Sequence, residues 1–252
     1  MFAQERHNAI KKIVREHRRL NFAALQALIQ VSPATLRRDL TDLEKSGEII
    51  RVHGGVLDPG YVRSETSFDE RLLRNSTAKK AIAAKAAGMI PAGATVFVDA
   101  GSTCLEAGKV LLGRKDLRIL THSVALMAAA LHGQAELLCI GGELRRVSGA
   151  LVGGAALGAL AVLRVDCALI GASGMDWEGC STTEVFEAEI KRVILERSRQ
   201  SILLADVSKW REASTVQFAE WSAFGDWVTD RRVSPKDARA LKALGVAVHA
   251  AA

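Results

Sequence analysis

The segment from Val31 to Leu57 constrains the fold of this 252-residue chain more than any other part. Ser32 is a good N-cap because its hydroxyl accepts a hydrogen bond from a backbone N–H, and Pro33 suits the first helical position, where no donor is needed. Gly47 supplies a plausible left-handed stop. Between cap and stop, three residues recur at helical spacing and form one apolar stripe: Leu36, Leu40 and Leu43.

The other faces of this predicted helix carry groups that suit DNA. Thr35, Arg37 and Arg38 can meet phosphates or base edges. The run Glu48–Val52 with the following His-Gly-Gly predicts a short β-hairpin, so the segment is typical of a winged helix-turn-helix. The alternative to DNA binding is a basic three-helix domain with a structural role, in which the two arginines are only solvated. The residues expected to contact DNA are Ser32, Thr35, Arg37, Arg38, Arg51, His53 and Gly54.

Two further helices are predicted before the recognition helix. The first, Gln4–Arg18, carries Ile10, Ile13 and Val14 on one face. Asn21 caps the second, Phe22–Ile29, for which we expect Leu25, Leu28 and Ile29 to face inward. Gln30 and Val31 then form a tight turn.

The charge of the chain agrees with this interpretation. Residues 1–57 contain ten Lys or Arg and six Asp or Glu, so this short segment holds most of the chain's net charge of +6. A basic DNA-binding module requires such a bias, although a solvated basic surface would give the same count.

These residues resemble the DeoR family of bacterial transcriptional regulators. The resemblance rests on Arg37-Arg38-Asp39-Leu40 in the recognition helix and on His53-Gly54-Gly55 in the wing, and the order of later features extends it over nearly the whole chain. One departure is Gln30, which stands in the helix-turn-helix turn where the family usually has Gly.

After the wing, Asp58, Pro59 and Gly60 begin a predicted linker. The expected organisation is a DNA-binding domain over 1–57, a linker over 58–75 and a larger α/β domain over 76–252. A helix is predicted near Thr77–Met89 and a last one near Pro235–Leu244. Strand-like runs alternate with helical segments, which favours a mainly parallel sheet: Thr95–Asp99, Arg118–Thr121, Glu136–Ile140, Cys167–Gly171 and Ser201–Ala205.

Small and hydroxylated residues follow these strands, at the edge where ligands bind in open α/β sheets. Gly101, Ser102 and Thr103 suit a phosphate at a helix N-terminus. Asp99 suits a sugar hydroxyl, and Lys209 suits a phosphate. Each of these turns taken alone has a structural alternative, a simple helix cap or a surface ion pair. Lys191 has the alternative of an exposed helical lysine that contacts no ligand. The expected effector contacts are Asp99, Gly101, Ser102, Thr103, Thr121, Ser123, Gly141, Gly142, Gly171, Ser173, Lys191, Asp206 and Lys209.

The resemblance implies an effector domain that is similar in fold to ribose-5-phosphate isomerase and that senses phosphorylated sugars or related metabolites. The phosphate loop and Asp-x-Ser-Lys element of the family match Asp99–Thr103 and Asp206–Lys209. His122 stands where Asn is common, and we expect it to be structural.

Two classes of function remain open. The first is a repressor of a sugar or polyol operon that a phosphorylated metabolite releases from operator DNA, paired as a homo-oligomer, dimer or tetramer. The second is a sugar-phosphate isomerase with a DNA-binding appendage. The isomerases have an acidic Gly-Ala-Asp-Glu turn and a following Lys, whereas this chain has Gly171-Ala172-Ser173-Gly174 and retains only Asp176. Binding without turnover is therefore expected, with no cofactor.

The cysteines and the N-terminus indicate the compartment. Four cysteines without close pairing or metal-like spacing favour reduced thiols: Cys104, Cys139, Cys167 and Cys180. The polar start Gln4–His7 is unlike a signal peptide, and no stretch approaches the roughly 20 apolar residues of a membrane span. A soluble, cytoplasmic protein with no metal is expected.

Overall fold

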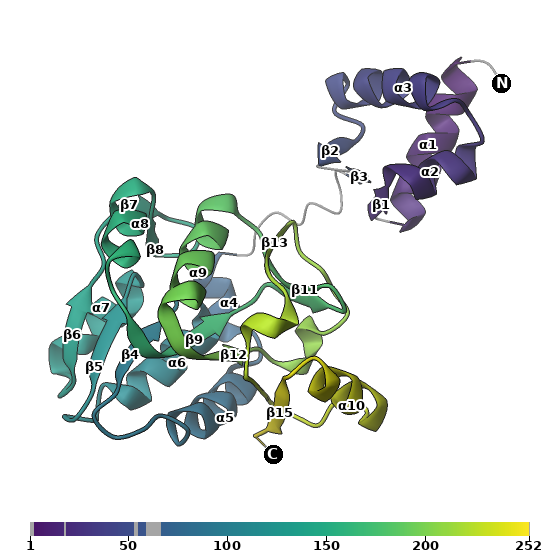
Figure 1. Ribbon diagram of the computed structural model, residues 1–252. Coiled ribbons are helices and arrows are strands. Elements are labelled where there is room, and N and C mark those ends of the chain that lie inside the picture. Colours follow the sequence, from purple (N-terminus) through teal and green to yellow (C-terminus); the bar gives the residue numbers. More distant parts are fainter. Residues whose placement is uncertain (1–2, 18, 53–54, 59–66, 252) are drawn as a thin grey trace. The chain divides into compact units, whose positions relative to one another are not determined.

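The computed structural model describes residues 3–17, 19–52, 55–58 and 67–251. The chain divides into two compact units, Met1–Glu65 and Thr66–Ala252. Figure 1 labels their elements.

The first unit is a winged helix-turn-helix. Its helices are α1 (Ala3–His17), α2 (Phe22–Ile29) and α3 (Pro33–Lys45), and its sheet has the order β1-β3-β2 with β1 (Arg19–Asn21), β2 (Ile50–Val52) and β3 (Gly55–Leu57). The side chain of Asn21 caps α2, and that of Ser32 caps α3, as predicted. The helices bury one common core: Ile10, Val14, Leu25, Ile29, Leu36, Leu40, Leu43, Ile49 and Val56.

Two features of this unit differ from the expectation, and a third shows how Gln30 fits the expected turn. Strand β1, which pairs with β3, was not predicted because three residues are too few to show a period of two. Leu28 was expected to face inward, but it is 50% exposed because the short helix α2 directs only one face to the core. Gln30 adopts a left-handed conformation with φ 55° and ψ 46°, so the turn keeps the geometry that glycine normally provides.

The second unit is a three-layer α/β domain. Its main sheet has seven described strands, all parallel, in the order β15-β14-β12-β9-β4-β5-β6. The strands are β4 (Thr95–Val98), β5 (Arg118–Thr121), β6 (Glu136–Cys139), β9 (Val165–Gly171), β12 (Ser198–Leu204), β14 (Asp226–Thr229) and β15 (Ala247–Ala250). The predicted mainly parallel sheet is therefore confirmed.

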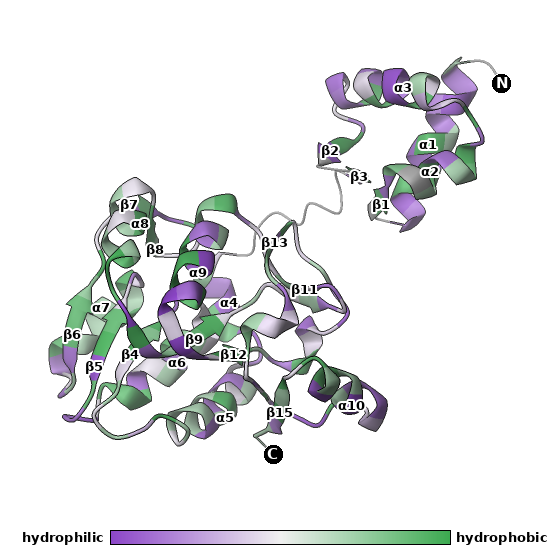
Figure 2. Ribbon diagram, in the orientation of Figure 1, coloured by the Kyte–Doolittle hydropathy of each residue, from purple (hydrophilic) through white to green (hydrophobic). Residues whose placement is uncertain are grey.

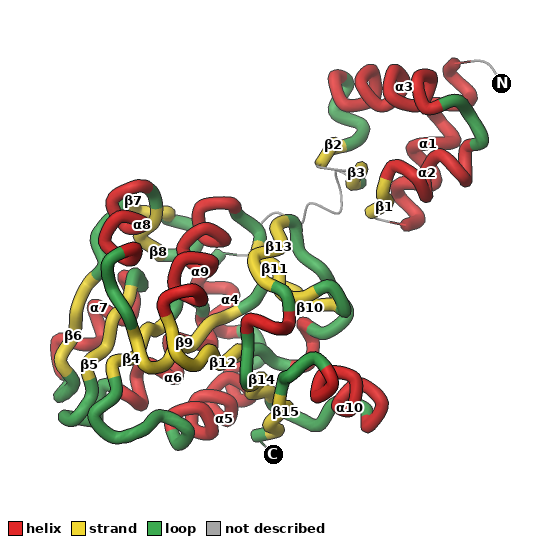
Figure 3. The backbone as a smooth tube through the Cα atoms, in the orientation of Figure 1, coloured by secondary structure: helices red, strands yellow, loops and turns green. Residues whose placement is uncertain are grey.

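Helices cover both faces of this sheet (Figure 3). Val96 and Val98 of β4 pack with α5 (Ser76–Ala87), α6 (Ser102–Leu111) and α7 (Val124–Ala129). Phe97 faces the opposite core with α8 (Gly154–Ala161), α9 (Val185–Arg197) and α10 (Pro235–Ala243). Because successive strand residues point to opposite faces, a run of apolar residues such as β4 serves both cores. Figure 2 shows this hydrophobic character along the central strands.

Short elements surround the carboxyl ends of the strands. Strands β7 (Glu143–Arg145) and β8 (Ala150–Val152) form a hairpin, and β10 (Gly174–Asp176), β11 (Gly179–Thr182) and β13 (Val216–Ala219) form a small antiparallel sheet. The single turns η1 (Ala130–His132), η2 (Val207–Lys209) and η3 (Trp221–Ala223) follow strands or helices. Helix α4 (Phe68–Leu73) lies within the segment that was expected to be a linker. Among the described residues, no helix has the length and apolar character to cross a membrane.

Candidate functional site

The order of the strands marks one position as a ligand site. From β4 the sheet extends through β5 to β6 on one side, and the chain then returns so that β9 pairs with the other side of β4. Such a reversal is a topological switch point, where ligands bind outside the carboxyl ends of the strands. The loops at this point begin at Asp99 after β4 and at Gly171, the last residue of β9.

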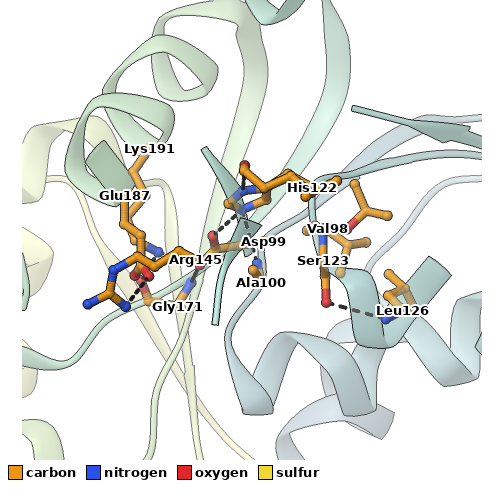
Figure 4. Close-up of polar contacts among 12 residues, drawn as sticks. Val98, Asp99, Ala100, His122, Ser123, Leu126, Arg145, Gly171, Glu187 and Lys191 are labelled. Atoms are coloured by element: carbon orange, nitrogen blue, oxygen red, sulfur yellow. Dashed lines mark hydrogen bonds and ion pairs between the residues drawn. The ribbon is translucent and has the colours of Figure 1, made fainter. Parts of the chain in front are cut away.

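Asp99 is the centre of a buried polar network at the switch point (Figure 4). Its Oδ2 accepts hydrogen bonds from the Lys191 ammonium of α9 and, at 2.9 Å, from Gly171 N–H. Lys191 Nζ also donates to Gly171 O at 3.0 Å. Burial opposes the charge of Asp99, but the charge of Lys191 and the contacts with His122 outweigh it, so the pKa of Asp99 lies below its usual value. The alternative of an exposed Lys191 is therefore wrong.

His122 links this network to the β7–β8 hairpin. Its Nδ1 lies 3.0 Å from Leu151 O, an acceptor, so that nitrogen donates. Its Nε2 lies 3.2 Å from the donating Ala100 N–H and 3.1 Å from Asp99 Oδ1. The ring stacks on Phe97 with centroids 5.7 Å apart and is buried, which agrees with the structural role expected for it.

The predicted phosphate-binding loop, Gly101–Thr103, follows Asp99 closely in the sequence. Gly101 is the N-cap residue of α6, and Ser102 and Thr103 occupy the first turn of this ten-residue helix. A helix N-terminus attracts anions because its first N–H groups lack partners in the helix. A Cβ on Gly171 would lie only 3.3 Å from Asp99 Oδ2 and 3.9 Å from Gly101 Cα, so the two loops approach closely. Glycine permits this approach.

Several of the expected effector contacts are engaged within the protein. Thr121 Oγ1 donates to Val98 O at 2.7 Å and accepts from Ser123 N–H at 3.1 Å. The Ser123 hydroxyl caps α7, and both residues are buried. Gly142 has φ 153°, and a Cβ there would lie 2.5 Å from Val152 O, so glycine is required by the turn. Thr121 and Ser123 therefore hold the loop after β5 in place, as the pair of Asp99 and Lys191 does for the loops after β4 and β9.

The remaining loop positions lie in more open surroundings. A Cβ on Gly141 would meet no atom within 4 Å. Ser173 is half-buried, and its N–H donates to Ser181 O at 2.9 Å, which leaves its hydroxyl as the group available to a ligand. These two residues remain candidate contacts.

A second polar cluster lies at the end of β12. Asp206 is buried and accepts from Ser208 N–H at 3.0 Å and from Asn75 Nδ2 at 3.4 Å, so it is not part of a simple surface ion pair. Nearby, the buried Lys79 donates to Arg74 O at 2.6 Å and to Arg71 O. Burial lowers the pKa of Lys79, Asp206 opposes that shift, and the charges of Lys209 and Arg71 add to it. Lys209 therefore belongs to a cationic cluster with Lys79.

Asp176 and Glu187 are the nearest candidate bases for the alternative isomerase function, and both are engaged within the protein. Glu187 accepts from Arg145 Nη1 at 3.1 Å, an ion pair that joins α9 to the β7–β8 hairpin. Asp176 Oδ1 accepts from Glu178 N–H at 2.9 Å and holds the β10–β11 turn. Among the described residues, no group of three His, Cys, Asp or Glu side chains is arranged to hold a metal ion.

The recognition helix of the first unit exposes Arg37 and Arg38, whereas Asp39 and Leu40 face inward. Arg37 lies over the ring of Phe22, 5.3 Å from its centroid. The Ser32 hydroxyl accepts from Thr35 N–H at 3.2 Å and contacts the Thr35 hydroxyl at 2.8 Å. The Arg-Arg-Asp-Leu motif is thus divided between an outer pair available to DNA and an inner pair that fixes the helix.

Two contacts fix the orientation of α3. Asp39 accepts from Arg6 Nη2 at 2.8 Å and lies 3.1 Å from His7 Nε2, and the hydrogen bond from Arg6 holds the pKa of Asp39 below its usual value. Arg51 of the wing donates to Thr41 Oγ1 at 3.2 Å. His53 and Gly54, also expected at the DNA, lie outside the described residues.

Sequence reasoning missed Lys79 and Arg71. Lys79 precedes Ile82, Ala83 and Ala86 at helical spacing, and all four are buried on one face of α5. A lysine in register with an apolar stripe was therefore a usable signal. Arg71 gave no such signal, because it lay in a segment too short and polar to be predicted as a helix.

Comparison with known proteins identifies both parts of the chain. The DeoR-like helix-turn-helix domain family matches residues 6–59, and the DeoR C terminal sensor domain family matches residues 74–231. The glycerol-3-phosphate regulon repressor of Haemophilus influenzae is 36% identical over 86% of this chain and 85% of its own length.

Other matches extend the comparison. The HTH-type transcriptional repressor GlcR of Bacillus subtilis is 33% identical over 92% of this chain and 90% of its own length. Among solved structures, a D-ribose-5-phosphate isomerase in complex with phospho-erythronic acid matches with a TM-score of 0.41 and 18% identity over 54% of each chain.

Proposed function

Because the chain belongs to the DeoR family of DNA-binding transcriptional regulators, we propose that it is a repressor released from its operator by a phosphorylated metabolite. The observation that carries the DNA-binding part is the exposed Arg37–Arg38 pair on a helix whose opposite face is buried. Arginine reads guanine edges and phosphates bidentately, so this face suits the major groove. Two such modules in a homo-oligomer would bind repeated half-sites in the cytoplasm.

The effector part of the proposal rests on the switch point. Gly101, Ser102 and Thr103 offer N–H and hydroxyl donors at the start of α6, and Lys209 offers a positive charge from the cluster after β12. Gly141 and Ser173 complete the proposed contacts. Relatives named glycerol-3-phosphate regulon repressor support the proposal of a small phosphorylated effector for this chain.

The same site argues for binding without turnover. Asp176 and Glu187, the nearest candidate bases for an isomerase, hold a turn and an ion pair. Proton abstraction from a sugar needs a positioned base and a partner for the developing negative charge. Incubation with ribose 5-phosphate, followed by NMR, should show no isomerisation above background. Turnover that disappears in Asp176→Asn would contradict this part of the proposal.

A thermal-shift panel of phosphorylated sugars and polyols, with the unphosphorylated compounds as controls, tests the effector class. A ligand of the folded state raises the melting temperature by mass action. We expect stabilisation by at least one phosphorylated compound and none by its unphosphorylated counterpart. Equal stabilisation by both would exclude the phosphate as the recognised group.

A further inference from the structure

Helix α4 carries an arginine with unusual surroundings. The Nε and Nη2 atoms of Arg71 are buried and make no hydrogen bond to the described residues. Its guanidinium carbon lies over the Phe68 ring, 6.0 Å from the centroid, a contact that leaves these N–H groups without acceptors. Buried donors without acceptors are rare because they lose their hydrogen bonds to water. Nε–H and one Nη–H lie on the same edge of a guanidinium and point the same way, which is the arrangement that binds two oxygens of one phosphate.

The described residues around Arg71 are rich in positive charge. Arg71 and Lys209 both act on the buried Lys79 as repulsive charges, and burial lowers the pKa of Lys79 still further. The buried acid among them is Asp206, which already accepts hydrogen bonds from Ser208 and Asn75. Glu106 also acts on Lys79 but is ion-paired with Lys109 at 2.7 Å. Among the described residues, Arg71 and Lys79 thus lie near one buried carboxylate, that of Asp206.

Helix α4 also packs against α6, the helix that the proposed phosphate loop precedes. Phe68 and Leu72 pack against the core cluster that includes Cys104 and Leu105 of α6, the helix that begins at Ser102. Asn75 adopts a left-handed φ of 53° between α4 and α5, and across this turn Lys79 donates to the Arg71 and Arg74 carbonyls. The same turn holds Arg71 close to the Lys79–Lys209 cluster.

We propose that Arg71 is a ligand of the effector phosphate, together with Lys209 and the Ser102–Thr103 loop, and that phosphate binding fixes α4 in place. This inference rests on the proposed function and adds a contact from outside the α/β core. Helix α4 is the first described element after residues 59–66, and its Phe68 N–H donates to Val147 O at 2.9 Å in the β7–β8 hairpin. Effector occupancy would therefore act on the segment that joins the sensor unit to the DNA-binding unit.

Calorimetry on the full chain tests the phosphate contact, with inorganic phosphate and glycerol 3-phosphate as probes. Arg71→Gln should weaken the affinity for both about tenfold or more, because a hydrogen-bonded charge is lost. Arg74→Gln is the matched control: it removes the same charge from an exposed side chain of the same segment and should leave both affinities unchanged. The melting temperature of ligand-free Arg71→Gln should stay the same or rise, since an unsatisfied buried group is removed.

Hydrogen exchange of residues 67–75 tests the coupling. Inorganic phosphate should slow exchange of this segment in the wild type and not in Arg71→Gln. A different result would separate this inference from the proposed effector site. If Lys209→Ala loses affinity for the two probes while Arg71→Gln retains it, and α4 gains no protection from hydrogen exchange, this inference is wrong. The proposed effector site would then stand. If the wild type binds neither probe, both fail.

Discussion

At the scale of single residues, the stability of the sensor unit depends on the buried carboxylate of Asp99 and its hydrogen-bond partners. Asp99 is 2% exposed and joins Lys191, His122 and Gly171 from three different segments. A buried ion pair contributes modest net stability, but removing one partner leaves the other charged group buried and alone. The pair therefore specifies how β4, β9 and α9 meet.

We predict that Asp99→Asn destabilises the sensor unit by about 3–5 kcal/mol, because the Lys191 ammonium is left without its carboxylate. Denaturant unfolding followed by tryptophan fluorescence measures this change. All four tryptophans lie in one network in the sensor unit: Trp177, Trp210, Trp221 and Trp227. The double variant Asp99→Asn with Lys191→Met is the control and should recover part of the loss. Equal stability of single variant and wild type would contradict the role of Asp99.

The same pair predicts a dependence on pH. The pKa of Asp99 in the folded state lies below its usual value, so its contribution is fully present above the unfolded carboxyl pKa near 3.9. The contribution is lost as the pH falls below that value toward the folded pKa. The difference in unfolding free energy between wild type and Asp99→Asn should therefore be constant from about pH 7 to 5 and shrink in more acidic solution. A difference that grows on acidification would have the wrong sign.

At the scale of elements, the helix-turn-helix turn carries a measurable strain. Gln30 has φ 55°, a conformation in which residues other than glycine are disfavoured. Gln30→Gly should stabilise the DNA-binding unit by about 0.5–1 kcal/mol, the relief of strain less the added chain entropy. Far-UV circular dichroism reports both units and tryptophan fluorescence only the sensor unit, so a change seen in the first signal alone belongs to the DNA-binding unit. Gln30→Ala, which keeps the strain, should change little. If Gln30→Gly lowers stability, the turn is not strained.

The recognition helix gives the second prediction at this scale. Arg37→Ala with Arg38→Ala should abolish sequence-specific DNA binding, at about 1–3 kcal/mol for each bidentate base contact that is lost. Exchange of Lys12 and Arg15 for Ala on α1 removes the same charge from exposed positions and should retain specificity. Because Arg37 also contacts Phe22, the single variant Arg38→Ala separates DNA contact from packing. An undiminished footprint of the double variant would refute the assignment of α3.

Particular elements show what the sequence could predict. The strands β4, β5 and β9 were found because they are apolar runs that end in small residues, and α3 was found from its cap and stripe. The hairpin β7–β8 was not predicted, because a three-residue strand is too short to show the alternation of apolar and polar residues. Whether Thr121 and Ser123 face a ligand or the protein depends on tertiary contacts between distant segments, which spacing alone does not reveal.

At the scale of the whole molecule, effector binding must change the affinity for DNA. Lys209→Ala should weaken the effector by roughly 1.5–3 kcal/mol, the range for a hydrogen bond to a charged group, and should leave operator binding intact. The variant would then remain bound to DNA when effector is added. Trp210 follows Lys209 directly, so binding should also change the tryptophan fluorescence of the wild type. Lys236→Ala, an exposed lysine on α10, is the control. Wild-type affinity in Lys209→Ala would remove Lys209 from the site.

The most direct test of the account is fluorescence anisotropy of a DNA duplex selected by the wild-type protein from a random pool. Phosphorylated sugars and polyols are then titrated into the complex, with unphosphorylated counterparts in parallel. The account predicts that at least one phosphorylated compound releases the duplex, by a coupling on the order of 1–3 kcal/mol, and that its unphosphorylated counterpart does not. Selection of no sequence, or a complex that every compound leaves unchanged, would contradict it.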